Sequence, residues 1–289
     1  MAVIEIQNLQ KSYGKHVGTR DVSFSVEQGE IFGFVGPNGA GKSTTIKALL
    51  GFIFAQGGTA SICGLDVVKH TKEIKAFTGY VPSDVRLYPS MRVAELLRRN
   101  AAFYGGGYTA ETKRLCTLFE IDTEKRFHEL STGNKKKVSI ACALMPSPKV
   151  IILDEPTGGL DPVMQKVLFE ELMRRTSAGA TVLLSSHNLA EVEEYCTRVA
   201  FIRDGSILAV TDLRQAVARH KIITVVGGGA APKEWTLVRE ENGARVFRTA
   251  QAGGEVLRAL AALAPEDFTV ENESMEEYFW DLYGLEDAQ

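Results

Sequence analysis

The stretch Gly36-Pro37-Asn38-Gly39-Ala40-Gly41-Lys42-Ser43-Thr44 fits the phosphate-loop pattern G-x-x-x-x-G-K-[ST] at every fixed position. Glycines let the backbone bend so that successive N–H groups converge on phosphate oxygens, which a Cβ would obstruct. Lys42 has the length to reach the β- and γ-phosphates, and the Ser43 hydroxyl is a ligand for Mg²⁺. The alternative is a glycine-rich loop without a ligand, which the complete pattern disfavours. We therefore predict nucleoside triphosphate binding by Gly36, Asn38, Gly39, Gly41, Lys42, Ser43 and Thr44.

Two carboxylates, Asp154 and Glu155, directly follow the apolar run 150–153. Four consecutive branched aliphatic residues are typical of a strand buried on both faces of a parallel sheet. Open α/β sheets bind their ligands at the carboxyl ends of such strands. Asp154 is suited to hold Mg²⁺ through water, and Glu155 is suited to polarise an attacking water molecule. The alternative, an exposed acidic turn, is disfavoured directly after a strand of this kind.

A single histidine, His187, ends a second apolar run at 181–186. A lone histidine usually has a structural role. Its place at the carboxyl end of a neighbouring strand favours a contact with the γ-phosphate, so His187 joins Glu155 and Lys42 as a candidate catalytic residue.

The segments around these residues alternate between strand and helix patterns, which predicts an α/β fold. A short apolar strand ending at Val35 precedes the loop, and a helix over 44–50 follows it and stops at Gly51. Other expected elements are an antiparallel pair of strands at 3–9 and 22–26 joined after a turn at 11–14, helices between 92 and 132, a helix over 135–145 capped by Ser131 or Thr132, and a hairpin over 198–210. The run Lys135-Lys136-Lys137 is interpreted as a solvated helix face and not as a nucleic-acid patch.

The region after residue 221 has a different pattern, in which strands at 222–226, 235–239 and 245–249 precede a helix, a further strand and a final amphipathic helix. Asn242-Gly243 is a strong hairpin signal. The β-β-β-α-β-α order predicts a small α+β module without a catalytic cluster. We therefore expect two domains, 1–217 and 218–289.

Composition excludes several classes of protein. The chain of 289 residues is 45% hydrophobic and 24% charged with a formal net charge of −3, so it lacks the basic excess of a nucleic-acid binder. No apolar run approaches the roughly 18 residues that span a bilayer, and no signal peptide is expected at the N-terminus. The cysteines are widely spaced, which predicts reduced thiols in a cytosolic protein: Cys63, Cys116, Cys142 and Cys196.

Taken together, residues 3–215 resemble an ABC-type ATPase, the nucleotide-binding subunit of an ABC transporter. Leu130-Ser131-Thr132-Gly133-Asn134 resembles the family signature Leu-Ser-Gly-Gly-Gln, and Gly159-Leu160-Asp161 resembles the D-loop. Tyr13 lies where the family stacks an aromatic ring on adenine, and His187 resembles the switch histidine. The resemblance implies a P-loop NTPase fold with a mixed sheet core, an antiparallel β subdomain and a helical subdomain, together with ATP and Mg²⁺ as ligands.

Two departures from the family pattern affect the site. Thr132 and Asn134 replace Gly and Gln of the signature, whereas Ser131 and Gly133, the γ-phosphate contacts, are kept. Ser83 occupies the place of the Q-loop glutamine. A serine is too short to reach Mg²⁺ directly, so a bridging water or Asp84 is expected to substitute.

The family mechanism implies that two nucleotide-binding domains, from a homodimer or a pair of paralogues, stack head to tail. Each ATP then lies between one phosphate loop and the partner's Ser131 and Gly133. Hydrolysis opens the dimer and drives a transmembrane permease from the inner face of the membrane. The tail 275–284 resembles type-2 exporter ATPases of the bacitracin-resistance and sodium-export kind. The alternatives are a soluble assembly-scaffold ATPase and a regulatory module that does not hydrolyse ATP.

Overall fold

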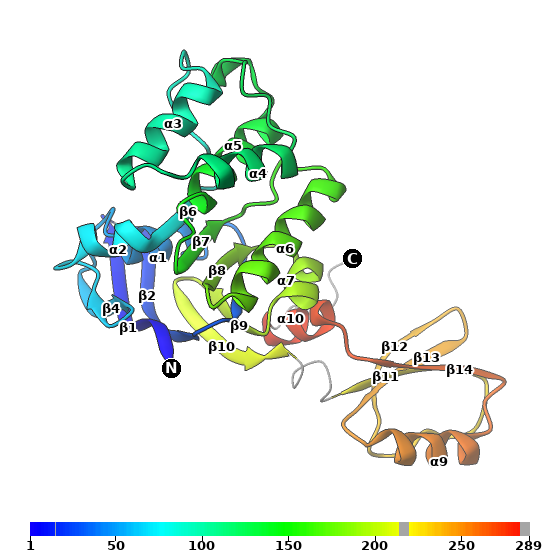
Figure 1. The fold of residues 1–289 in the computed structure, drawn as a ribbon. Helices are drawn as coiled ribbons and strands as arrows, with labels where there is room; N and C mark the ends of the chain where they lie inside the picture. Colours follow the sequence, from blue (N-terminus) through cyan, green and yellow to red (C-terminus); the bar gives the residue numbers. More distant parts are fainter. Residues whose placement is uncertain (15, 214–219, 284–289) are drawn as a thin grey trace. The chain divides into compact units, whose positions relative to one another are not determined.

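The computed structural model describes residues 1–14, 16–213 and 220–283, and it divides into two compact units, Met1–Val210 and Thr211–Gln289 (Figure 1). The domain boundary expected between residues 217 and 218 lies outside the described residues. The division into domains 1–217 and 218–289 therefore stays a prediction.

A ten-stranded mixed sheet forms the centre of the first unit. In spatial order its strands are β5 (Leu65–Asp66), β4 (Gly57–Ile62), β1 (Ala2–Tyr13), β2 (His16–Glu27), β10 (Ser206–Asp212), β9 (Arg198–Arg203), β3 (Ile31–Val35), β8 (Thr181–Ser186), β7 (Val150–Asp154) and β6 (Thr78–Val81). The strands from β9 to β6 pair in parallel, whereas β1 pairs with β2 and β4 antiparallel. This confirms the predicted mixed sheet with an antiparallel β layer.

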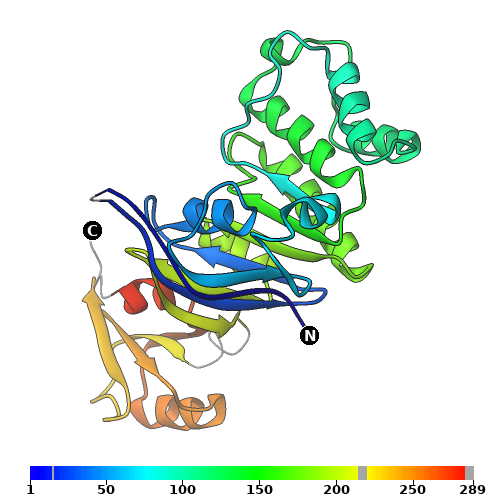
Figure 2. The same cartoon turned by 90° about the vertical axis from the view of Figure 1, so that its left-hand side faces the viewer.

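The strands β1 and β2 have 12 residues each and are longer than the predicted strands at 3–9 and 22–26. They form a long pair, drawn in dark blue in Figures 1 and 2. The expected turn at 11–14 is wrong for Lys11–Tyr13, because these residues pair with Thr19, Val17 and His16. Register shifts interrupt the ladder on both sides of Leu9. Such bulges break the alternation of polar and apolar residues from which a strand is recognised in a sequence, so the pattern ends before the strand does.

Helices cover both faces of the parallel strands. Phe32 and Phe34 of β3 join a buried cluster with Ile46 of α1 (Lys42–Leu49). Gly33 faces the other side, where its missing Cβ would lie 3.0 Å from Val192 of α7 (Leu189–Tyr195). The helix α6 (Pro162–Ser177) also packs on β3 and β8, and α2 (Thr71–Phe77) packs on β6. Buried on both faces, β3 is apolar along almost its whole length.

The predicted helical region contains α3 (Val93–Phe103), α4 (Thr109–Leu118), the short 3₁₀ helix η1 (Phe127–Glu129) and α5 (Thr132–Leu144) (Figure 1). Ser131 caps α5, because its Oγ accepts a hydrogen bond from the Asn134 N–H at 3.3 Å. Across residues 1–14, 16–213 and 220–283, no helix combines the length and the apolar character that crossing a membrane requires.

The interpretation of residues 135–137 as a solvated face is wrong for two of the three lysines. Lys136 is 2% exposed and Lys137 is 8% exposed. The cause is the position of α5, which packs against α3, α4 and β6. A helix enclosed on several sides buries residues that a solvated helix would present to water.

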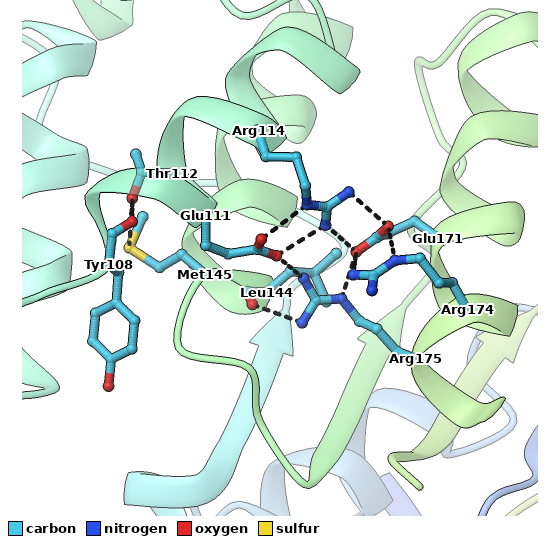
Figure 3. A network of polar contacts seen from close by, with 9 residues as sticks. All are labelled: Tyr108, Glu111, Thr112, Arg114, Leu144, Met145, Glu171, Arg174 and Arg175. Carbon is cyan, nitrogen blue, oxygen red and sulfur yellow. Dashed lines mark hydrogen bonds and ion pairs between the residues drawn. The ribbon is translucent and has the colours of Figure 1, made fainter. Parts of the chain in front are cut away.

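A network of charged side chains joins α4 to α6 (Figure 3). Arg114 binds Glu171 across the two helices, with 2.6 Å between Nη2 and Oε1, and it also binds Glu111 on its own helix. Arg175 of α6 also pairs across the two helices, with 2.6 Å between its Nη2 and Oε1 of Glu111 on α4. Arg174 and Arg175 complete the contacts of Glu171, at 2.9 and 2.7 Å. Three arginines therefore surround one carboxylate that is 3% exposed.

The second unit is a four-stranded antiparallel sheet in the order β12 (Thr236–Glu241), β13 (Ala244–Thr249), β11 (Lys221–Val226) and β14 (Asp267–Asn272), with α9 (Gly253–Leu263) and α10 (Met275–Tyr283). Its core places apolar residues of the sheet against α9: Ile223, Val225, Trp235, Phe247, Val256, Leu260 and Leu263. Asn242 and Gly243 both have positive φ, of 51° and 80°, as a tight hairpin turn requires. The predicted β-β-β-α-β-α order is confirmed.

Candidate nucleotide-binding site

The phosphate loop lies between β3 and α1, where the surrounding backbone excludes larger residues. A Cβ on Gly36 would lie 2.3 Å from the Ile202 carbonyl oxygen. A Cβ on Gly41 would lie 2.3 Å from the Gly18 carbonyl oxygen, and its φ of 112° is in the left-handed region. The neighbouring strands therefore hold this loop in one conformation.

The loop presents free backbone donors. Within the described part of the chain, no oxygen accepts a hydrogen bond from the N–H groups of Gly39, Gly41, Lys42, Ser43 or Thr44. The Ala40 N–H donates to the Pro37 carbonyl oxygen at 3.2 Å, and the next N–H engaged is that of Thr45, which donates to the Gly41 carbonyl oxygen at 2.9 Å. Unpartnered N–H groups at a helix N-terminus form an anion-binding site. The arrangement fits the phosphates of a nucleotide.

Lys42 lies across this loop. Its Nζ donates to the carbonyl oxygens of Gly36 and Pro37, at 2.6 and 3.2 Å, and lies 3.6 Å from Glu155 Oε1. Burial lowers the pKa of Lys42, and the neighbouring charges of Glu155 and Asp154 oppose that shift. The loop thus holds a largely desolvated cation next to its free N–H groups.

The two carboxylates lie at the carboxyl end of β7, as the sequence predicts. Asp154 is 1% exposed and accepts a hydrogen bond of 2.6 Å from Ser185 Oγ on the adjacent strand β8. Glu155 has a φ of 48°, unusual for a residue with a side chain, and its N–H binds the Ser185 carbonyl oxygen at 3.1 Å. Ser185 therefore orders both acidic residues.

Glu155 brings the candidate catalytic residues together. Its Oε1 lies 3.6 Å from Lys42 Nζ and 3.4 Å from His187 Nδ1. The Glu155 side chain is 28% exposed and that of His187 is 64% exposed, so water and a ligand have access to both. A carboxylate in this position can accept a proton from a water molecule beside the phosphate loop.

Tyr13 lies near Thr44 of the phosphate loop. A Cβ on Gly18 would lie 3.1 Å from Tyr13 Cε2 and 2.9 Å from Thr44 Cγ2, which places Tyr13 and Thr44 against one short stretch of β2. Tyr13 is 47% exposed. Stacking of this ring on a nucleotide base stays a prediction.

In the described part of the chain, the signature residues Ser131 and Gly133 are not bonded to the phosphate loop of their own chain. Ser131 is exposed, and among the described residues no hydrogen bond or ion pair connects Ser131 or Gly133 with residues 36–44. Gly133 instead packs on the predicted D-loop, where a Cβ would lie 2.2 Å from the Gly159 carbonyl oxygen. The signature is thus attached to the segment that follows Glu155.

Gly133→Ala is expected to lower the free energy of unfolding by about 1–3 kcal/mol, because the new methyl group overpacks this backbone contact. Thermal or urea unfolding of the full chain measures the change. Gly254 is the matched control, since it is also the second residue of its helix and a Cβ there would meet no atom within 4 Å. Gly254→Ala should be neutral or stabilising because alanine favours helices. Equal stabilities for the two variants would contradict the contact.

Ser83 is exposed, and its hydrogen bond within the described residues is made by its carbonyl oxygen, which accepts from Lys136 Nζ at 2.8 Å. Asp84, the suggested substitute, pairs with Arg86 at 2.7 Å. The structure does not join either side chain to Ser43 or Asp154, and the role of Ser83 at the metal stays a prediction.

Sequence reasoning missed two residues of this site, Ser185 and Lys136. Ser185 was detectable in principle, because in neighbouring parallel strands it pairs with Asp154. Lys136 precedes the buried Ile140 by four residues, so it lies on the apolar stripe of α5. A lysine at such a position signals a buried partner.

The donor set suits magnesium only together with a nucleotide. No group of three or more His, Cys, Asp or Glu residues in the described ranges can hold a metal ion by itself. The Ser43 hydroxyl and the Asp154 carboxylate are hard oxygen ligands of the type that Mg²⁺ takes alongside phosphate oxygens. These two side chains fit the Mg²⁺ ion that the sequence predicts.

Comparisons with known proteins agree with this geometry. A family model described as ABC transporter matches residues 19–158. A linearmycin resistance ATP-binding protein of Bacillus subtilis is 34% identical over 235 residues, covering 78% of this chain and 76% of the relative. A Nod factor export ATP-binding protein I of Cupriavidus metallidurans is 29% identical and covers 99% of this chain and 98% of the relative.

A solved ATP-binding subunit of an ABC transporter is 33% identical, with a TM-score of 0.69, covering 74% of this chain and 91% of that chain. The fold, the loop and the sequence relatives lead to the same assignment. The chain belongs to the ABC transporter family, as an ATP-binding subunit with the ATPase cassette of that family.

Proposed function

We propose that this subunit hydrolyses ATP with Mg²⁺ to drive a separate transmembrane permease that exports its cargo. The observation that carries the hydrolytic part is the position of Glu155, whose carboxylate lies between Lys42 and His187 at 3.6 and 3.4 Å. A base beside the phosphate-binding loop is what the attack of water on a γ-phosphate requires.

The residues divide this work between them. The N–H groups of the loop and the Lys42 ammonium bind the phosphates, and Ser43 with Asp154 would hold Mg²⁺, which neutralises phosphate charge when it is bound. Glu155 accepts the proton of the attacking water. His187, which is 64% exposed, contacts the γ-phosphate from the end of β8.

A second nucleotide-binding domain completes the site in this proposal. Ser131 is exposed and has no bond to the loop of its own chain within the described residues, so its hydroxyl is accessible to a nucleotide held by another copy or a paralogue. ATP between the two domains stabilises their closed arrangement, and its hydrolysis removes the γ-phosphate that Ser131 and Gly133 bind. The size of this population shift is limited by the difference between ATP and ADP in holding the closed state.

Export is supported by the relatives, whose names describe linearmycin resistance, Nod factor export and a probable multidrug ABC transporter. In this reading the chain lies on the cytoplasmic face of the membrane because it binds the permease. Residues 218–289 form an accessory α+β domain.

Membrane co-purification tests the proposal. A tagged Glu155→Gln chain is extracted in mild detergent with ATP, which holds the closed dimer, and in parallel with ADP. We expect an integral membrane permease in the ATP sample. Recovery of soluble assembly partners alone would support the scaffold alternative, and an absence of ATP turnover by the wild-type chain would support the regulatory one; either would contradict the proposal.

A further inference from the structure

Lys136 makes contacts that its place in a lysine run does not suggest. Its Nζ donates to the carbonyl oxygens of Pro82, Ser83 and Glu155, at 2.9, 2.8 and 3.2 Å. An ammonium group has three protons and accepts nothing, so three carbonyl oxygens satisfy it completely. The residue is 2% exposed, so water does not take the place of these acceptors.

These three carbonyls come from two different loops. Pro82 and Ser83 follow β6, and Glu155 follows the adjacent parallel strand β7. Lys136 itself lies on α5, whose cap is Ser131 of the signature. One ammonium therefore joins the loop after β6, the loop after β7 and the signature helix.

The contact with Glu155 matters because its backbone is in an uncommon conformation. A φ of 48° at a residue with a Cβ is energetically unfavourable and persists only where the surroundings hold it. The Ser185 carbonyl oxygen holds the Glu155 N–H at 3.1 Å, and Lys136 holds the Glu155 carbonyl oxygen. The peptide groups on both sides of Glu155 are thus fixed, and with them the direction of its side chain.

Burial of the ammonium has an electrostatic cost. Desolvation lowers the pKa of Lys136, and the charges of Asp154, Glu155 and Asp84 act in the opposite direction. A methionine of similar length would fill the same space without that cost. The charge therefore contributes contacts that an apolar side chain cannot make.

The adjacent lysine shows that burial on α5 does not by itself produce hydrogen bonds of this kind. Lys137 is 8% exposed, yet across the described ranges it forms no hydrogen bond or ion pair like those of Lys136. The two neighbours thus offer a comparison of buried lysines that differ in their contacts.

We infer that Lys136 is a positioning residue for ATP hydrolysis: it fixes the main chain of Glu155 and ties it to the loop that carries Ser83. In this chain the link between that loop and the catalytic carboxylate runs through backbone carbonyls and one ammonium, and does not require a long side chain at position 83. The inference rests on the proposed hydrolytic role of Glu155.

Lys136→Met tests it in the full-length chain. We expect kcat to fall about 10- to 100-fold, since displacement of a catalytic group by about 1 Å has an effect of this order. The Kd for ATP should stay within about twofold, because among the described residues no hydrogen bond or ion pair joins Lys136 to the phosphate loop. Lys137→Met is the control and should retain the wild-type kcat. Lys136→Arg, which keeps the charge and the donors, should recover part of the loss.

A double-mutant cycle distinguishes positioning from general damage. In single-turnover reactions, Lys136→Met should cause no further loss of rate in the Glu155→Gln background, because its effect acts through Glu155. If the rate losses of Lys136→Met and Glu155→Gln were fully additive, the inference would be overturned. A wild-type kcat for Lys136→Met, with Glu155→Gln inactive, would overturn it as well. Both results would leave the hydrolytic function intact. A wild-type chain without turnover would instead refute the proposed function. Should Lys136→Met fail to fold by thermal melting, Lys136→Gln replaces it. Its amide keeps two N–H donors without the charge, so its kcat should lie between those of Lys136→Met and Lys136→Arg, again with no further loss in the Glu155→Gln background.

Discussion

Glu155→Gln is expected to lower the rate of ATP hydrolysis about 10²–10⁴-fold, because an amide cannot accept the proton of the attacking water. The substitution keeps the shape of the side chain and leaves the main-chain contacts of Glu155 with Ser185 and Lys136 in place. It also removes the carboxylate that lies 3.6 Å from Lys42 Nζ. The lysine charge is then left for the phosphates, so ATP affinity should be unchanged or higher.

Phosphate release under saturating ATP measures the rate, and equilibrium titration with a fluorescent ATP analogue measures the affinity. Glu170→Gln is a control for the loss of one carboxylate, because Glu170 is 57% exposed and its one ion pair among the described residues is with Lys166, at 4.0 Å. It should hydrolyse ATP at the wild-type rate. Hydrolysis by Glu155→Gln at that same rate would show that another group is the base.

The sequence predicted the parts of the site that local rules determine. A complete phosphate-loop pattern before a helix defines Lys42 and Ser43, and Asp154, Glu155 and His187 each end an apolar run. Since neighbouring parallel strands end at one edge of a sheet, these residues were expected to meet, and Glu155 Oε1 does lie within 3.6 Å of Lys42 Nζ and 3.4 Å of His187 Nδ1. Their chemical roles stay predictions.

The contacts that were missed depend on packing between distant segments. Lys136 meets Pro82 and Glu155, 54 and 19 positions away. Its place on the apolar stripe of α5 indicates burial, but it does not identify these distant partners. Arg114 and Glu171 are 57 positions apart, and each alone resembles an ordinary exposed charge. The partner of a charge is a property of how helices pack, which hydrophobic periodicity does not specify. The bulges of β1 obscured even a local pattern.

Glu171→Gln is expected to lower the free energy of unfolding of the first unit by about 3–5 kcal/mol at neutral pH. The buried carboxylate is the shared partner of three arginines, and removal of its charge leaves those guanidinium groups with only Glu111 as an acidic partner in this network (Figure 3). Breaking a buried ion pair on one side costs this much because the remaining charge is uncompensated. Urea unfolding followed by circular dichroism measures it. Tryptophan fluorescence would follow the second unit instead, since Trp235 and Trp280 both belong to it.

The pH dependence gives this prediction a second, independent readout. Burial raises the pKa of Glu171, but the hydrogen bonds and charges of its arginine partners outweigh burial and lower the pKa from 4.5 to about 2. Between these two values the unfolded chain binds more protons than the folded chain, so stability rises with pH. The contribution, about 3 kcal/mol, is complete above pH 4.5 and is lost as the pH falls toward 2. The difference in stability between wild type and Glu171→Gln should therefore shrink on acidification.

Glu170→Gln, on the same helix, should cost about 0–0.5 kcal/mol. A Glu171→Gln effect as small as this, or one independent of pH, would mean that the arginines stabilise the junction of α4 and α6 without this carboxylate.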